Sequence, residues 1–275
     1  RRGRGRRRAA RPRRAGRAPR LTVPEGDTIR AAAEALRLLE GEVLQVEAVH
    51  PRAAALAIAP RLDGRRLQRV EAVGKNLLFA FQGGLVLRSH LRLRGRWEVR
   101  PAADPIPGRP WLVLRGRDYQ AILWNGPLLE LTPRPIRQRI GPDIMSDPPD
   151  VEGMVARLRS TDQRRFLGEA LLDQRLLAGI GNRWRAEALH SARLSPWLRL
   201  HDLADEELKA FLASSSAAMR AGRERPAVYR RAGRPCPRCG TVVSSAPQGE
   251  AGRTVYWCPG CQPGVPPVTR PPAGS

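Results

Sequence analysis

Four cysteines near the end of the chain have the spacing of a metal site. Cys236 and Cys239 form one CxxC pair, and Cys258 and Cys261 form a second pair after 18 intervening residues. Each CxxC turn directs two sulfurs at one point, so two such turns complete a tetrahedral four-cysteine site for zinc. Because closed coordination leaves no open position, we expect one structural Zn²⁺ ion. A pair of redox dithiols or an iron site is the alternative.

Two other segments carry groups that suit phosphate. Residues 178–182 (AGIGN) join two helical patterns, and two glycines in three residues permit a tight turn with positive φ. We expect Asn182 to cap the following helix, whose free N–H groups make a phosphate clamp. Arg253 lies at the expected tip of a β-hairpin between the cysteine pairs, where a cation is a natural phosphate contact. A well-capped helical hairpin and a solvated arginine are the structural alternatives.

The net charge of +23 favours a polyanionic partner. Residues 1–22 contribute eleven arginines and no acid, and the rest of the chain still carries an excess of twelve positive charges. Only two of the 49 basic residues are lysine, Lys75 and Lys209, which indicates GC-rich coding. Codon bias explains arginine over lysine but not bases over acids. Nucleic acid is therefore the expected partner, with a general surface bias as the alternative.

The sequence shows neither a membrane span nor a secretory signal. No run of 18 or more apolar residues is present, and no apolar segment follows the basic N-terminal stretch. We therefore expect a cytoplasmic protein that does not enter a membrane. Paired cysteines in such a protein fit metal binding better than disulfides.

The hydrophobic pattern predicts the elements that position these residues. An amphipathic helix is expected over about 27–40, and short strands between Gly and Pro turns follow over 43–132. Many evenly spaced strands indicate an antiparallel sandwich or barrel. The Pro-rich, acidic stretch 141–150 is the expected domain boundary, and the pattern beyond it is helical.

Four motifs in one order resemble the formamidopyrimidine-DNA glycosylase/endonuclease VIII family. They are PEGDT at 24–28 before an amphipathic helix, GKNLL at 74–78, the AGIGN turn and the four-cysteine ribbon. The resemblance runs from Val23 to about Gln262. It implies an α+β fold with an N-terminal helix on an antiparallel β-sandwich, then a helix–two-turns–helix domain with a C-terminal zinc-ribbon finger.

The resemblance also implies a domain organisation and a partner. We expect a disordered arginine-rich tail, a catalytic β-sandwich domain, a helical DNA-binding domain, a zinc finger and a disordered tail over residues 1–22, 23–140, 141–229, 230–265 and 266–275. Double-stranded DNA with damaged bases or abasic sites would bind between the domains, and the damaged nucleotide would flip out of the stack. The protein is expected to act as a monomer at the nucleoid.

Three residues would carry the chemistry by this resemblance. Pro24 matches the N-terminal proline whose amine attacks the deoxyribose, displaces the base and forms an iminium, after which elimination cuts the strand on both sides. An α-amino group has a pKa of about 8, so part of it is neutral near physiological pH. Glu25 matches the general acid/base, with a helix-terminal carboxylate as its alternative role. Lys75 matches the lysine placed at the phosphate and the departing base.

Further residues would contact DNA. The resemblance implies phosphate contacts around the lesion for Asn182 and Arg253. Arg92, Leu93 and Arg94 align with the family's void-filling loop, and Leu93 would be the wedge inserted where the base has left. The alternative for Leu93 is a place in the core, although a leucine between two arginines before a glycine fits an exposed wedge better.

Val23 bears on the chemistry of Pro24. As long as Val23 is attached, the Pro24 nitrogen is a tertiary amide whose lone pair cannot attack a sugar. We expect translation to start at Val23, read as formyl-methionine from a GTG codon, and the initiator to be removed. Residues 1–22 are then either a disordered nucleic-acid-binding tail or upstream sequence translated in error.

The expected substrate follows from the branch of the family. PEGDT is closer to the endonuclease VIII branch, and only residues 223–227 stand where the purine-specific branch has a long lesion-capping loop. We therefore expect oxidised pyrimidines to be favoured. Two alternatives stay open: a zinc-ribbon DNA-binding protein without catalysis, and an abasic-site lyase with little glycosylase activity.

Overall fold

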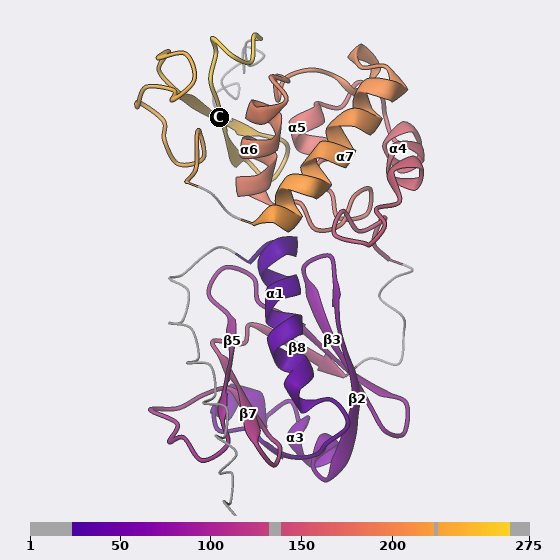
Figure 1. The fold of residues 1–275 in the computed structure, drawn as a ribbon, viewed down its shortest axis with the longest axis vertical. Helices are drawn as coiled ribbons and strands as arrows, with labels where there is room; N and C mark the ends of the chain where they lie inside the picture. Colours follow the sequence, from indigo (N-terminus) through magenta and orange to yellow (C-terminus); the bar gives the residue numbers. More distant parts are fainter. Residues whose placement is uncertain (1–23, 132–138, 223–224, 265–275) are drawn as a thin grey trace, which may run out of the picture.

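The protein forms two lobes (Figure 1) in a computed structural model that describes residues 24–131, 139–222 and 225–264. The β lobe comprises residues 24–131, and the helical lobe comprises the described residues from 139 onward. Val23 and the two expected tails lie outside the described residues. Within these ranges no helix is long and apolar enough to span a bilayer.

The first helix, α1 (Gly26–Leu36), continues as a 3-10 turn (Arg37–Leu39). Ile29, Ala33 and Leu36 lie three or four residues apart, so one face of the helix is buried against β2, β3 and β5. The prediction of a helix over about 27–40 is confirmed, with the last turn tightened into 3-10 form.

Eight antiparallel strands build the β lobe in the order β5-β7-β6-β1-β2-β3-β4-β8. Strand β1 pairs with β2 through its first residues and with β6 through its last, so it belongs to both halves of a sandwich. The two halves share one core with α1, which confirms the predicted helix on an antiparallel sandwich. The strands are β1 (Val43–Glu47), β2 (Arg65–Val73), β3 (Asn76–Phe81), β4 (Leu85–His90), β5 (Arg96–Pro101), β6 (Leu112–Arg115), β7 (Tyr119–Trp124) and β8 (Leu128–Leu131). Two short helices, α2 (Pro51–Ala54) and α3 (Ala59–Leu62), follow β1.

The helical lobe has its own core. Its helices are α4 (Val151–Arg159), α5 (Leu167–Ala170), α6 (Asn182–Ser191) and α7 (Asp205–Ala221), with a 3-10 turn (Leu200–Asp202) before α7. Ile144 and Met145 join this core from the stretch expected to be the boundary. Arg30 of α1 donates a hydrogen bond to the Met145 carbonyl at 2.8 Å, so this stretch also contacts the β lobe.

A β-hairpin lies near the end of the described chain and leads into the second cysteine pair. Strand β9 (Ser244–Gln248) pairs with β10 (Arg253–Trp257), and α6 packs beside β10. Trp257 meets Trp197 edge to face at 5.5 Å, which fixes the hairpin to the helical lobe. The predicted hairpin is confirmed, with Arg253 at the first position of β10, just after the turn.

Candidate active site between the lobes

Glu25 of the β lobe caps a helix of the helical lobe. Glu25 is 1% exposed, and its carboxylate accepts hydrogen bonds from the backbone N–H groups of Arg183, at 2.9 Å, and Trp184, at 3.1 Å. These N–H groups lie in the first turn of α6, where a negative charge is stabilised by the helix dipole. A Cβ at Gly181 would lie 2.4 Å from the Glu25 carboxyl carbon. Because Gly181 has no side chain, the Glu25 carboxylate can occupy this space.

The expected cap by Asn182 is wrong. Gly181 holds the N-cap position, and Asn182 is the first residue of α6. The Asn182 side chain turns toward the hairpin, where its amide donates to the Thr254 carbonyl at 2.9 Å. Two N–H groups of the expected phosphate clamp are thus already occupied by a carboxylate from the other lobe.

The turn before α6 uses its two glycines differently. Gly179 has a φ of +102°, as expected for a tight turn, and its carbonyl accepts a hydrogen bond from Gly26 at 2.9 Å. Gly181 has negative φ and is required for space rather than for backbone freedom. The first turn of α1 and the AGIGN turn are therefore in backbone contact.

The contacts of Glu25 and Gly26 with α6 and the turn before it form what we call the joint between the lobes. Lys75 lies at this joint, in the turn between β2 and β3. Gly74 of this turn has a φ of +58°, and its N–H donates to the Asp143 carboxylate of the helical lobe at 2.6 Å. Burial lowers the pKa of Lys75 to about 8; the charge of Glu25 acts in the opposite direction, and that of Arg253 adds to the lowering. The three ionisable groups therefore act on one another across the joint.

A fully buried arginine ties α6 to the hairpin. Arg185 is 0% exposed and donates hydrogen bonds to the Thr254 carbonyl at 2.8 Å and the Gln248 side chain at 3.1 Å. It also donates to the Asn182 side chain. Through the Thr254 carbonyl, Arg185 fixes the residue that follows the exposed Arg253. Burial, with the nearby Arg253, lowers the pKa of Arg185 to about 10, so it remains a cation at neutral pH.

The loop between β4 and β5 presents three exposed side chains. Leu93 is 73% exposed, which rules out the alternative that it is a core residue, and Arg92 and Arg94 flank it. The Arg92 N–H donates to His90 Nδ1 at 3.1 Å, at a backbone φ of +48° for Arg92. Burial and the charges of Arg88 and Lys75 lower the pKa of His90 to about 4, so its imidazole is neutral. Because the charge of Lys75 acts on the pKa of His90, the start of this loop lies close to the joint.

The four cysteines meet as predicted. All four Sγ atoms lie within 4.8 Å of one another, with Cys239 at 3.4 Å from both Cys258 and Cys261. None forms a disulfide. Four sulfurs at about 2.3 Å from a central ion are separated by slightly less than 4 Å, so these thiols can hold one tetrahedral metal ion.

Comparison with known proteins decides the family. Residues 23–122 match the N-terminal domain of formamidopyrimidine-DNA glycosylase, and residues 140–228 match its H2TH domain. A probable endonuclease 8 2 of Streptomyces coelicolor is 37% identical over an alignment of 273 residues. The match covers 90% of this chain and 96% of that protein. The chain belongs to the formamidopyrimidine-DNA glycosylase/endonuclease VIII family. Its members are DNA glycosylases that act in DNA repair.

A further curated relative and a solved structure are also similar to this chain. The DNA-(apurinic or apyrimidinic site) lyase Nei2 of Mycolicibacterium smegmatis is 34% identical, over 87% of this chain and 99% of its own. The crystal structure of formamidopyrimidine-DNA glycosylase from Lactococcus lactis, bound non-covalently to DNA with an abasic site, matches with a TM-score of 0.71. That match is 24% identical over 87% of this chain and 100% of the other, and it supports the glycosylase fold.

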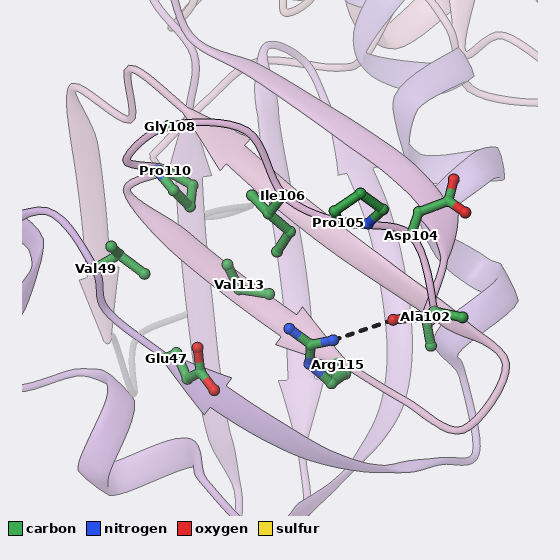
Figure 2. A pocket seen from close by; sticks show the side chains of 11 residues that line it. Glu47, Val49, Ala102, Asp104, Pro105, Ile106, Gly108, Pro110, Val113 and Arg115 are labelled. Carbon is green, nitrogen blue, oxygen red and sulfur yellow. Dashed lines mark hydrogen bonds between the residues drawn. The ribbon is translucent and has the colours of Figure 1, made fainter.

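One cavity of this glycosylase-family chain lies apart from the joint. It has a volume of about 370 Å³ and lies on the β lobe between β1, β6 and residues 102–110 (Figure 2). Arg115 lines it and donates to the Ala102 carbonyl at 3.1 Å. None of the residues predicted to act in catalysis or DNA binding lines this cavity, so it is not part of the candidate site.

Sequence reasoning missed two groups at the site. Arg185 could not be distinguished from the many solvated arginines of the chain, although it lies one helical turn after Asn182. His90 precedes the Arg92–Arg94 loop by two residues, and its burial is a tertiary effect. Glu25 from the N-terminal motif and Lys75 from the lysine motif are brought within electrostatic range of one another and of Arg253.

Proposed function

We propose that this protein is a bifunctional DNA glycosylase and abasic-site lyase that removes oxidised bases and then cuts the strand. The observation that carries the proposal is the joint itself, where Glu25 is held by α6 and Lys75 and Arg253 lie close enough to act on each other's charge. A nucleophile, a buried carboxylate and two cations beside a phosphate backbone are the groups that base excision with strand cleavage needs.

Pro24 is the proposed nucleophile. Its secondary amine attacks C1′ of the damaged nucleotide, and the bond to the base breaks, with the electron pair leaving on the base. The amine proton then passes to the Glu25 carboxylate, and the nitrogen lone pair forms an iminium with C1′ as the C1′–O4′ bond breaks. The ring oxygen takes the proton from Glu25 and becomes the C4′ hydroxyl. The iminium acidifies the C2′ proton, so loss of that proton expels the 3′ phosphate, and a second elimination expels the 5′ phosphate. The amine is available only when Val23 is no longer attached.

Glu25 and Lys75 supply proton transfer and charge. Glu25 is the proposed acid that protonates the ring oxygen as the sugar opens, and its fixed position favours transfer along one direction. Lys75, with a pKa of about 8, places an ammonium beside the phosphate at neutral pH and can release a proton more readily than an exposed lysine.

Four exposed side chains and the half-buried Asn182 around the joint are the proposed DNA contacts. Asn182 and Arg253 would hold the phosphates around the lesion, and Arg92 and Arg94 would flank the strand on either side of Leu93. Leu93 would enter the gap that the flipped nucleotide leaves in the stack. The abasic-site DNA bound to the Lactococcus lactis relative supports damaged duplex DNA as the partner.

The four cysteines would hold one structural Zn²⁺ ion. When bound, the ion supplies rigidity to the ribbon and takes no part in the reaction, because four thiolates close its coordination. The ion would also fix the hairpin, because the strand that carries Arg253 and Thr254 leads directly into Cys258.

Oxidised pyrimidines are the proposed substrates. The short stretch 223–227 in place of a long capping loop and the likeness to a probable endonuclease 8 2 support this choice. The test uses protein beginning at Pro24 and matched duplexes that carry an oxidised pyrimidine, an oxidised purine, an abasic site or no damage. We expect the oxidised pyrimidine to be excised faster than the oxidised purine, with ends from both eliminations. Faster excision of the oxidised purine would contradict the proposed preference.

An abasic-site lyase with little glycosylase activity is the second candidate. The name of the Mycolicibacterium smegmatis relative, which is an abasic-site lyase, favours it. The same set of duplexes separates the two functions, because a lyase without glycosylase activity would cut the abasic duplex and leave both damaged bases in place.

A further inference from the structure

His190 lies against the cysteine cluster without being one of its four ligands. It belongs to the last turn of α6 and is 4% exposed. Its Nε2 atom lies 3.3 Å from the Sγ atom of Cys236, which is within hydrogen-bond distance for sulfur. A buried imidazole in contact with a single sulfur needs a reason, because an apolar side chain would fill the same space at a lower desolvation cost.

The chemistry of the cluster fixes the direction of this hydrogen bond. A cysteine that holds a metal ion is a thiolate and carries no proton. The hydrogen in the contact must therefore come from His190, which requires a proton on Nε2. A metal ion with four thiolates has a net negative charge, so N–H donors from the surrounding protein stabilise it.

A second residue supports the same arrangement through the backbone. The Arg238 N–H points at the Cys236 sulfur at 3.4 Å, and the Arg238 guanidinium donates to the His190 carbonyl at 2.8 Å. These hydrogen bonds connect the turn that carries Cys236 and Cys239 to the C-terminal end of α6. The helix dipole favours a cation such as Arg238 at that end. Glu187, one turn earlier, is occupied by the backbone N–H groups of residues 227–229.

We propose that His190 is an outer-sphere partner of the metal site, which holds the Cys236 thiolate by an Nε2–H···S hydrogen bond and slows loss of the ion. The proposal rests on the proposed structural zinc. It gives α6 a fixed connection at each end: His190 and Arg238 to the cysteine turn, and Asn182 and Arg185 to the hairpin.

The test measures zinc release rather than activity. Wild-type protein, His190→Phe, His190→Gln and the control His201→Gln are loaded with zinc, and transfer of zinc to an excess of chromophoric chelator is followed with time. His201 is a suitable control because its side chain is 49% exposed and pairs with Asp202 away from the cysteines. Outer-sphere partners change metal affinity by about 10- to 100-fold, so we expect release from His190→Phe to be faster by about tenfold.

The glutamine variant separates hydrogen bonding from packing. Its side-chain amide can place an N–H near the position of the imidazole Nε2, so we expect release within about twofold of wild type, as for His201→Gln. Equal rates for His190→Phe and wild type, or equally fast release from the Phe and Gln variants, would overturn the proposal. Absence of zinc from purified wild-type protein would instead contradict the proposed zinc site.

A second measurement needs no variant. In zinc-loaded wild-type protein labelled with ¹⁵N-histidine, we expect the His190 ring, like that of His90, whose Nδ1 accepts a hydrogen bond, to carry its proton on Nε2, and the His190 proton to exchange slowly with water. A His190 ring protonated on Nδ1 alone would overturn the proposal even if the variants failed to fold.

Discussion

The carboxylate of Glu25 lies 3.1 Å from the backbone nitrogen of Trp184, so a residue at the start of the β lobe caps a helix of the helical lobe. The two residues are 159 positions apart in the chain. Pro24 immediately precedes Glu25, and this contact therefore sets where the proposed nucleophile stands relative to α6. The joint between the lobes and the candidate active site are built from the same hydrogen bonds.

Replacement of Glu25 is expected to affect stability as well as catalysis. Glu25→Ala leaves two buried helix N–H groups without their acceptor, and we expect the free energy of unfolding to fall by about 1–2 kcal/mol. Glu25→Gln keeps one acceptor oxygen and should lose less stability, yet base excision should fall by about 10²- to 10⁴-fold, because proton transfer is lost. Urea unfolding and single-turnover excision measure the two effects.

The exposed Glu34 provides the matched control for Glu25. Glu34 lies on the same helix and pairs with Arg30 in an exposed i,i+4 contact at 3.4 Å, so Glu34→Ala should change stability by less than about 0.5 kcal/mol. Equal stability losses for the two alanine variants would contradict the capping role of Glu25.

DNA affinity is expected to weaken as the pH rises through the pKa of Lys75. Burial lowers that pKa from 10.5 to about 8, so the unfolded chain binds more protons than the folded protein between pH 8 and 10.5. Between pH 8 and 10.5 the folded protein therefore loses the buried charge of Lys75. With it the protein loses the ammonium that is proposed to contact the phosphate. We expect Kd for a duplex with an uncleavable abasic analogue to rise by about tenfold between pH 7 and 9.5.

Two variants control for other titrating groups in this experiment. Lys75→Arg stays charged and should bind with little change over the same range. Lys209→Arg replaces a half-buried lysine that pairs with Glu152 and Glu206 on the helical lobe, and it should follow wild type. A pH dependence that persists in Lys75→Arg would show that another group is responsible.

Leu93→Ala is expected to impair excision of a paired damaged base more than cleavage at an abasic site. Filling the vacated stack offsets an unstacking cost of a few kcal/mol, so excision should fall by about 10- to 100-fold and abasic cleavage by much less. Leu56→Ala, at an exposed leucine elsewhere on the β lobe, is the control. Similar losses on both substrates would indicate a role for Leu93 other than the wedge.

Arg253→Ala is expected to weaken binding to all lesions by the same factor. A phosphate contact carries no information about the base, so the slope of log K against log salt should become shallower by about one unit. Binding titrations at several salt concentrations, on duplexes with two different lesions, measure both effects. A loss confined to one lesion would mean that Arg253 reads the base.

Local pattern predicted the parts of the molecule that depend on neighbours in the sequence. The spacing of Ile29, Ala33 and Leu36 predicted α1, and the two CxxC pairs predicted the sulfur cluster. Leucine between Arg92 and Arg94 predicted an exposed loop. In each case the determining interactions lie within a few residues or follow from a fixed ligand geometry.

The joint between the lobes could not be predicted in the same way. Asn182 has the residue type of a helix cap, but the carboxylate that caps α6 comes from Glu25, which only the tertiary fold brings near. Arg185 looks like a surface residue in a chain with 49 basic residues, yet it is fully buried among uncharged oxygen acceptors. Contacts of this kind depend on how two lobes with separate cores meet.

Pro24 is the central residue of the proposed mechanism, and borohydride trapping tests its role most directly. Protein beginning at Pro24 and intact protein retaining residues 1–23 are each verified by mass and incubated with abasic duplex and sodium borohydride, which reduces an iminium to a stable amine. We expect a covalent protein–DNA complex from the first protein, weakened in Pro24→Gly, and none from the second, which should still bind DNA. Equal trapping and cleavage by the intact protein would contradict the assignment of Pro24 as the nucleophile.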